Sequence, residues 1–138
     1  MNSELDPHFQ EQLKRMIEDR DNYGSNQSGI HRGIQWSMRK PYNSYWCGYV
    51  KFESSITLSN EKIEEMERYA HGGFTSGIGF DCSHYDDFAP MYITELNKWF
   101  GLTEGSFKDY HYVRNCLEKI IDCFFEYQPE TESFPDDD

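Results

Sequence analysis

The stretch from His71 to Asp87, HGGFTSGIGFDCSHYDD, carries several side chains that can bind a metal or transfer a proton. Imidazole and carboxylate groups are ligand types that proteins offer to divalent metals. His71, Asp81, His84 and Asp87 form a candidate metal set, which would suit a small metal-dependent hydrolase. Their spacing matches no HExxH or paired CxxC pattern. A structural interpretation stays open, in which these groups bond to nearby backbone at a helix end and in a turn.

The same stretch offers a candidate nucleophile, Cys82, with His84 two residues later. On a strand such residues share one face, so the imidazole could act as the base. The sequence provides no third orienting group, and a buried structural cysteine is the simpler interpretation. The nearby glycines form neither GxGxxG nor GxxxxGK[ST], so they predict no nucleotide fingerprint, and no cofactor is expected.

A second segment with chemical potential lies upstream, in residues 31–46, HRGIQWSMRKPYNSYW. No acidic residue occurs from Asn22 to Phe52, although the chain has a net charge of -12. Cationic side chains can hold a phosphate, and aromatic rings can stack on a base. In the alternative, the rings belong to the core and the cations balance an acidic surface. The candidate set for an anionic, nucleotide-like ligand is Arg32, Trp36, Arg39, Lys40, Trp46 and His84.

The composition predicts one soluble domain. The length of 138 residues is that of a single domain, and 17% aromatic residues can build a core although only 37% of the chain is hydrophobic. The four cysteines form no CxxC pair, which favours reduced thiols. No segment approaches the ~20 apolar residues of a membrane span, and the start lacks signal-peptide features. We therefore expect a cytoplasmic chain with no membrane partner.

Hydrophobic periodicity and capping residues predict three to four helices around a small antiparallel sheet, an α+β fold. Strands are expected over residues 33–38, 45–52 and 74–82, and a polar loop over residues 21–29. The domain would span residues 1–126, followed by an acidic, flexible tail over residues 127–138. The expected helices, with their boundary residues, are 6–20 (Asp6 and Pro7), 60–70 (Ser59), 90–100 (Pro90 and Gly101) and a last helix from Ser106 to the residues before Pro129.

The motifs YWCGYV, HGGFT and GFDCSHYDD are followed by a helix start, KDYHYVRNCLEKI. In this order they resemble a widespread family of small uncharacterised bacteriophage proteins. Members often show a GYV strand, then HGG[IFL]T, then GFD[CT][AS]H and an Asp shortly after. The similarity spans about Tyr45 to Cys123. The segment between HGGFT and GFDC is shorter here than in many members.

The resemblance implies a phage accessory protein in the host cytoplasm that counters a host defence by binding, in an anti-CRISPR-like manner. The expected partner is a small nucleotide-like ligand or a host defence protein whose nucleic-acid site the acidic surface would occupy. The net charge argues against direct, nonspecific nucleic-acid binding. A homo-oligomer is left open, and the metal-dependent hydrolase stays the alternative function.

Overall fold

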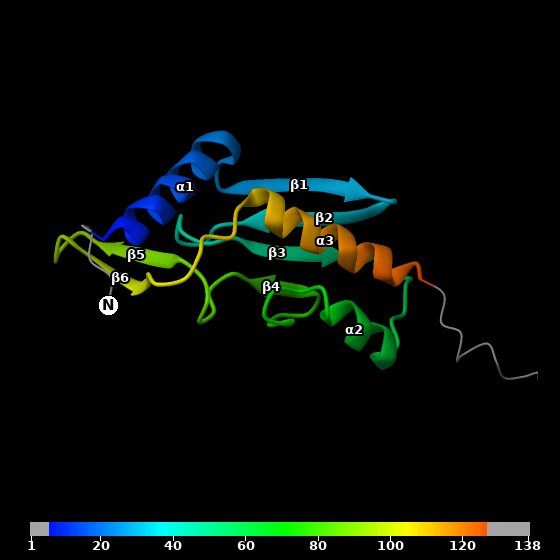
Figure 1. The fold of residues 1–138 in the computed structure, drawn as a ribbon. Coiled ribbons are helices and arrows are strands. Elements are labelled where there is room, and N and C mark those ends of the chain that lie inside the picture. The colour runs from blue at the N-terminus through cyan, green and yellow to red at the C-terminus, as the bar shows by residue number, and fades with distance from the viewer. Residues whose placement is uncertain (1–5, 127–138) are drawn as a thin grey trace, which may run out of the picture.

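The computed structural model describes residues 6–126, which fold into three helices and two antiparallel sheets (Figure 1). The expected α+β class is therefore confirmed, whereas the expected acidic tail over 127–138 lies outside the described residues. The elements are α1 (Pro7–Tyr23), β1 (Asn26–His31), β2 (Ile34–Arg39), β3 (Cys47–Lys51), α2 (Asn60–Glu67), β4 (Gly79–Asp81), β5 (Ala89–Ile93), β6 (Lys98–Leu102) and α3 (Tyr110–Phe124).

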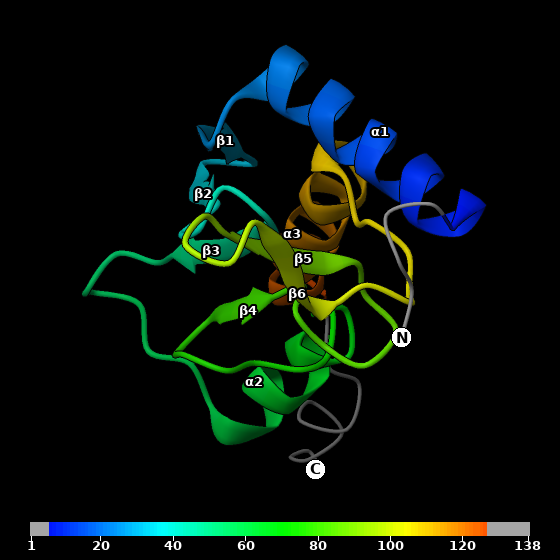
Figure 2. The ribbon, with the colours of Figure 1, turned by 90° about the vertical axis from the view of Figure 1, so that its left-hand side faces the viewer.

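The main sheet has the strand order β1-β2-β3-β4, with every neighbouring pair antiparallel. Along β2, buried Ile34, Trp36 and Met38 alternate with exposed residues. The buried set faces α3, which packs on β2 and β3. Figure 2 shows α3 on one side of these strands, while the other side carries no helix. The period-2 alternation of β2 thus gives the sheet one face that packs in the core and one face that is exposed.

Helix α3 supplies the centre of the core, because Val113, Leu117 and Ile120 follow the 3.6-residue period and are completely buried. A Cβ built on Gly48 of β3 would lie 3.2 Å from Leu117 Cδ2. The missing side chain lets the helix approach the sheet closely, and the ring of Phe80 on β4 occupies the neighbouring space.

Strand β1 corrects the expectation of a polar loop over residues 21–29. It pairs with β2 through a two-residue turn in which Arg32 and Gly33 both have positive φ, 53° and 83°. Such a turn matches the twist of a hairpin, so it can hold a polar strand in register. Gly29 also allows the Trp36 ring to lie across β1, since a Cβ there would be 2.6 Å from the indole.

The expected helix over residues 90–100 is wrong, because this segment forms the β5–β6 hairpin. Pro90 pairs with Gly101, and a Cβ on Gly101 would lie 3.0 Å from the Ala89 carbonyl oxygen. Asn97 takes a positive φ of 48° in the connection, as hairpin loops require. Figure 1 shows the hairpin at the end of the molecule opposite α2. The Trp99 ring packs 5.9 Å from Phe9 of α1 and thereby attaches the hairpin to the core.

The helix boundaries are partly as expected. Asp6 and Ser59 cap α1 and α2 as predicted, but α2 ends at Glu67 rather than near residue 70. Asp109, not Ser106, caps α3, because its Oδ1 accepts from the Tyr112 N–H at 2.9 Å. Ser106 instead forms a parallel bridge with Asp87. The expected strand over 74–82 is reduced to β4, since Gly77 (φ 59°) precedes it in a turn. Pro129, the expected end of the last helix, lies outside the described residues.

Two further properties bear on function. Within residues 6–126, no helix combines the length and the apolar character needed to cross a bilayer. Cys47, Cys82, Cys116 and Cys123 are all buried and unpaired. Cys116 and Cys123 lie on the buried side of α3, where the helical pattern predicts small apolar side chains.

Candidate ligand-binding face

The face of the main sheet opposite α3 is largely exposed. Because Trp36 pairs with Val50 and both point toward α3, the neighbouring pairs Gln35–Lys51 and Ser37–Tyr49 point away from it. Residues of β1 point to the same side of the sheet as the β2 residues with which they pair, so Asn26, Ser28 and Ile30 also point away from α3. We call the β1–β3 part of this surface the open face, defined by Asn26, Ser28, Ile30, Gln35, Ser37, Arg39, Tyr49 and Lys51. On β4, Asp81 lies on the same side of the sheet, because it pairs with Cys47, the partner of Arg39.

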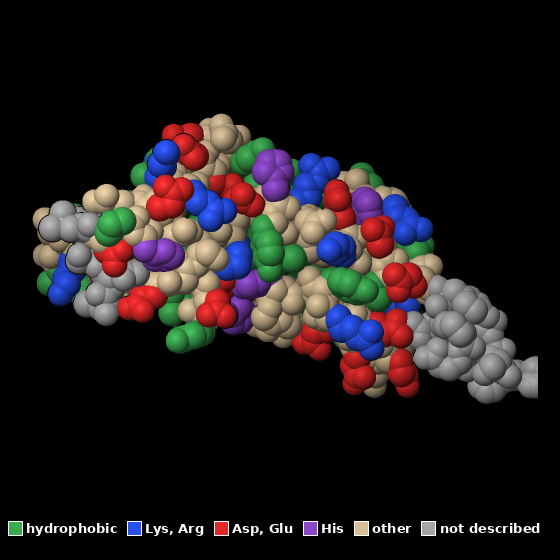
Figure 3. Space-filling model, in the orientation of Figure 1, with side chains coloured by type: hydrophobic (Ala, Val, Ile, Leu, Met, Phe, Trp, Pro, Cys, Tyr) green, Lys and Arg blue, Asp and Glu red, His purple; other side chains and the backbone are tan. Residues whose placement is uncertain are grey.

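The open face carries two cations, Arg39 and Lys51, that have no acidic partner among residues 6–126. The other cations of the basic segment are neutralised: Arg32 Nη1 lies 3.1 Å from an Asp122 carboxylate oxygen, and Lys40 pairs with Asp19. On the α3 side, seen in Figure 3, acidic and basic side chains are interspersed. One cation there, Arg114, forms a 3.0 Å ion pair with Glu118, whereas Lys119 is exposed and makes no ion pair within residues 6–126. Within β1 to β3 the open face thus carries two cations and no acidic side chain, in a chain of net charge -12.

Tyr49 provides an aromatic surface next to one of these cations. The Arg39 guanidinium carbon lies 5.6 Å from the centre of the Tyr49 ring. The ring extends over β4, since a Cβ on the paired residue Gly79 would be 2.6 Å from Tyr49 Cδ1. An aromatic ring beside a guanidinium is a common arrangement for stacking a base near its phosphate.

Three shallow hollows run along the open face. The first, of about 510 Å³, is lined by Asn26, Ser28, Ser37 and Arg39 among others. The second, of about 480 Å³, also includes Ser28 and Ser37 but contains Lys51 in place of Arg39. The third, of about 470 Å³, continues past Lys51. Because neighbouring hollows share lining residues, they form one elongated, shallow groove. Each hollow falls within the size range of small-ligand sites, although these hollows are less enclosed.

The structure does not bring the six expected ligand residues together. Only Arg39 lies on the open face. Trp36 and Trp46 are buried in the core, and the Lys40 side chain has no exposed surface. Arg32 lies in the β1–β2 turn with its guanidinium 4.4 Å from the Phe125 ring centre, and His84 lies near His71 beyond β4. In these positions the two tryptophans of the basic segment serve the core, as the alternative interpretation holds, whereas Tyr42 is exposed.

Two open-face residues, Tyr49 and Lys51, were missed by sequence reasoning. The signal was available in β3, CGYVK, where alternate residues must point to opposite faces. Without the register to β2, however, the sequence does not indicate which parity faces outward.

Lys40 and Trp46 converge on Asp19 of α1. Asp19 Oδ2 lies 3.0 Å from Lys40 Nζ and accepts from Trp46 Nε1 at 2.8 Å, while Oδ1 accepts from the Tyr110 N–H at 2.8 Å. The carboxylate therefore joins α1, the β2–β3 connection and the first turn of α3. Burial lowers the pKa of Lys40, although the hydrogen bond to Asp19 opposes this shift. This charged centre organises the fold and is not accessible to a ligand.

The candidate metal residues form two separate histidine–carboxylate pairs. His71 Nε2 lies 2.8 Å from Asp87 Oδ2, and His84 Nε2 lies 3.2 Å from Asp81 Oδ1. The two rings are neighbours, with centres 5.6 Å apart. Each imidazole nevertheless faces its own carboxylate, and no group of three His, Cys, Asp or Glu side chains converges as a metal site in the described part of the chain.

Asp87 is a completely buried carboxylate with several donors. Lys108 Nζ lies 2.9 Å from its Oδ1, and the His84 N–H donates to its Oδ2 at 2.9 Å. Burial alone would raise the pKa of Asp87, but the hydrogen bonds from His71, Lys108 and the His84 backbone outweigh it and lower the pKa. Asp87 therefore connects the residues after α2, the β4–β5 connection and the segment before α3.

The candidate nucleophile Cys82 and the neighbouring Tyr112 are held in their protonated forms. Burial raises the pKa of the Cys82 thiol well above its usual value, so the reactive thiolate is disfavoured. Burial also raises the pKa of Tyr112 to about 12, and its hydroxyl lies 2.8 Å from His71 Nδ1. These observations agree with the structural interpretation of this cluster.

Comparisons with known proteins give no match. The chain matches no protein-family model, no curated protein and no solved structure. The resemblance to bacteriophage proteins, which rests on short motifs, therefore stays a prediction. The open face is the candidate site, because it carries two cations without an acidic partner, a groove and a neighbouring aromatic ring, Tyr49.

Proposed function

We propose that this protein binds a phosphate-bearing, nucleotide-like ligand on the open face. The observation that supports it most is the pair of unpaired cations, Arg39 and Lys51, on one exposed face with Tyr49. In an acidic chain, such a face attracts small anions while the rest of the surface repels them. The proposal keeps the ligand class expected from the sequence but moves the site from the buried tryptophans to the exposed sheet.

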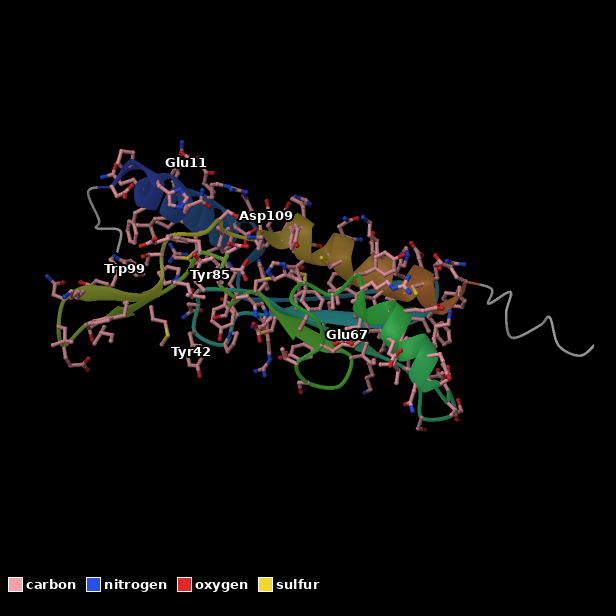
Figure 4. The ribbon with its side chains drawn as sticks, turned by 60° about the horizontal axis from the view of Figure 1, so that its bottom comes forward. Glu11, Tyr42, Glu67, Tyr85, Trp99 and Asp109 are labelled. Carbon is pink, nitrogen blue, oxygen red and sulfur yellow. The ribbon has the colours of Figure 1, made fainter. Side chains whose placement is uncertain are left out.

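Each part of the face has a chemical task in this proposal. The Arg39 guanidinium offers several N–H donors in one plane, which suits the oxygens of a phosphate, and Lys51 supplies a second positive charge. Tyr49 offers a ring on which a base can stack, and Ser28 and Ser37 offer hydroxyl groups for sugar or phosphate oxygens. Tyr42 projects from the β2–β3 connection, which begins at the Arg39 end of the face (Figure 4), and adds an exposed ring there.

The biological setting follows from the motif resemblance. A phage accessory protein with such a face would antagonise a host defence in the host cytoplasm by sequestering a nucleotide signal. The chain would act by stoichiometric binding and not as an enzyme. The other expected partner, a defence protein that normally binds nucleic acid, would contact the acidic surface formed by the acid-rich segment over 60–70 and the tail over 127–138. The tail lies outside the described residues.

Replacing Arg39 by glutamine is expected to weaken nucleotide binding about 10- to 150-fold, since a hydrogen bond to a charged group contributes about 1.5–3 kcal/mol. The measurement is a thermal-shift and calorimetric titration with cyclic nucleotides and ADP-ribose derivatives. A ligand at 100 times its Kd should stabilise the protein by about 2.7 kcal/mol.

The matched control is Lys14→Gln on exposed α1, which removes one positive charge far along the chain from the open face. Equal loss of affinity in both variants would indicate only a general charge effect. No stabilisation of the unaltered protein by any of these compounds would contradict the proposal.

A further inference from the structure

The two open-face cations occupy different hollows, and this arrangement bears on the kind of ligand. Arg39 lines the first hollow and Lys51 the second, while Ser28 and Ser37 line both. In the β2–β3 register, Arg39 faces Cys47, and Lys51 follows Cys47 by four residues. At about 3.3 Å per residue, the two Cα atoms are about 13 Å apart along the strands. The groove therefore has two cationic subsites with hydroxyl groups between them.

The side chains around the two subsites could contact the flat, weakly polar bases of a nucleotide ligand. At the Arg39 end, the Tyr49 ring lies beside the guanidinium. At the Lys51 end, the third hollow is lined by Ile30, Phe52 and Ile56 together with Lys51. A base could contact the apolar side chains at the Lys51 end, and a base at the Arg39 end could reach the Tyr49 ring beside the groove, since Tyr49 lines none of the three hollows.

The groove also limits the length of a polyanion. Glu53 lines the third hollow, beyond Lys51, so a further phosphate at that end would approach a carboxylate. Outside the segment from Asn22 to Phe52 the chain is strongly acidic. Because like charges repel, a long strand would gain no contacts from additional phosphates and would be repelled by the flanking surface.

We infer that the natural ligand is a dinucleotide, with two phosphate groups held separately by Arg39 and Lys51, rather than a mononucleotide or a long strand. This inference rests on the proposed function and specifies its ligand class. The Ser28 and Ser37 hydroxyls between the two subsites would hydrogen-bond to the sugar that links them.

The test compares AMP, 5′-phosphorylated diadenylate and a ten-residue oligoadenylate by calorimetric titration with the whole chain. The diadenylate is expected to bind at least tenfold more tightly than AMP, and the longer strand no more tightly than the diadenylate. For the diadenylate, the logarithm of the association constant should fall linearly with the logarithm of the salt concentration. The expected slope is about -1.4, the value for two neutralised phosphates on a single strand. Lys51→Gln should weaken diadenylate binding at least tenfold and AMP binding by a clearly smaller factor, because AMP can use the Arg39 subsite alone, while Lys14→Gln changes neither.

Equal affinity for AMP and the diadenylate would overturn the inference but leave the proposed function standing. Tighter binding of the ten-residue strand, with a steeper salt dependence, would overturn it in favour of a single-stranded nucleic-acid site. Absence of binding by all three adenine compounds would overturn the inference, and the broader nucleotide panel would then decide the proposed function. Because Lys51 is exposed and its side chain makes no ion pair within residues 6–126, the variant is expected to fold.

Discussion

Asp19→Ala is expected to lower the free energy of unfolding by about 3–5 kcal/mol, the usual cost of removing one partner from a buried ion pair. Without this carboxylate, the Lys40 ammonium stays buried with its charge uncompensated, and the donors of Trp46 and Tyr110 lose their acceptor. Such a loss is a large fraction of the stability of a small domain, so Asp19→Ala should be largely unfolded at moderate urea concentration.

Urea unfolding measures this effect, with Asp21→Ala as the control. Asp21 lies on the same helix but is exposed, and its contact with Arg20 is long, at 3.8 Å. The control should lose less than about 1 kcal/mol. The double variant Asp19→Leu, Lys40→Met should recover much of the stability, because an apolar pair leaves no buried charge. A loss below 1 kcal/mol for Asp19→Ala would show that the charged centre does not organise the fold.

Asp87→Ala is expected to destabilise the protein by a similar amount, about 3–5 kcal/mol, because Lys108 and His71 lose their buried acceptor. The effect should depend on pH. The folded state holds the Asp87 pKa below its ordinary value of 3.8, so the unfolded chain takes up this proton first as the pH falls. The stabilisation is therefore complete above that ordinary value and is lost as the pH falls through the lowered pKa of the folded state.

Chemical unfolding between about pH 6 and pH 2.5 separates this contribution from general acid denaturation. The stability difference between the unaltered protein and Asp87→Ala should be constant above about pH 5 and shrink in the acid range. Asp86→Ala, an exposed neighbour, is the control and should change neither the stability nor its pH dependence. A difference that stays constant down to pH 2.5 would contradict the buried carboxylate network.

The elements that could be predicted from sequence are those with local signals. Helix α1 begins after Asp6 with Pro7 as its first residue, and α2 begins after Ser59, because the capping side chains act on neighbouring N–H groups. The buried stripe of α3 follows from its 3.6-residue period. The start of α3 was misplaced because both Ser106 and Asp109 can cap a helix, and tertiary contacts of Ser106 decide between them.

The elements that could not be predicted depend on distant pairing. Strand β1 is polar and has no hydrophobic period of its own, so it forms only because β2 is held beside it by the turn at Arg32 and Gly33. The β5–β6 hairpin has helix-like boundaries, with Pro90 at its start and Gly101 near its end, but the packing of Trp99 on Phe9 favours strands.

The candidate site was predictable in its chemistry but not in its residues. The basic segment free of carboxylates is visible in the sequence, yet Lys40 and Trp46 turn inward toward Asp19, which lies far away in the chain. Tyr49 and Lys51 face outward because of the register with β2. Likewise, the four candidate metal residues are close in sequence, but tertiary partners such as Lys108 divide them into separate pairs.

Chemical-shift mapping with AMP tests the central claim most directly, because it detects even weak binding and locates it. Backbone amide resonances of the labelled protein are followed as AMP is added up to millimolar concentration. We predict that the largest shifts occur at open-face residues, above all Ser28, Ser37 and Tyr49, and that they disappear in Arg39→Gln. Shifts centred instead on His71, His84 and Tyr112 would contradict a nucleotide-binding open face, as would the absence of shifts both with AMP and with the cyclic nucleotides and ADP-ribose derivatives.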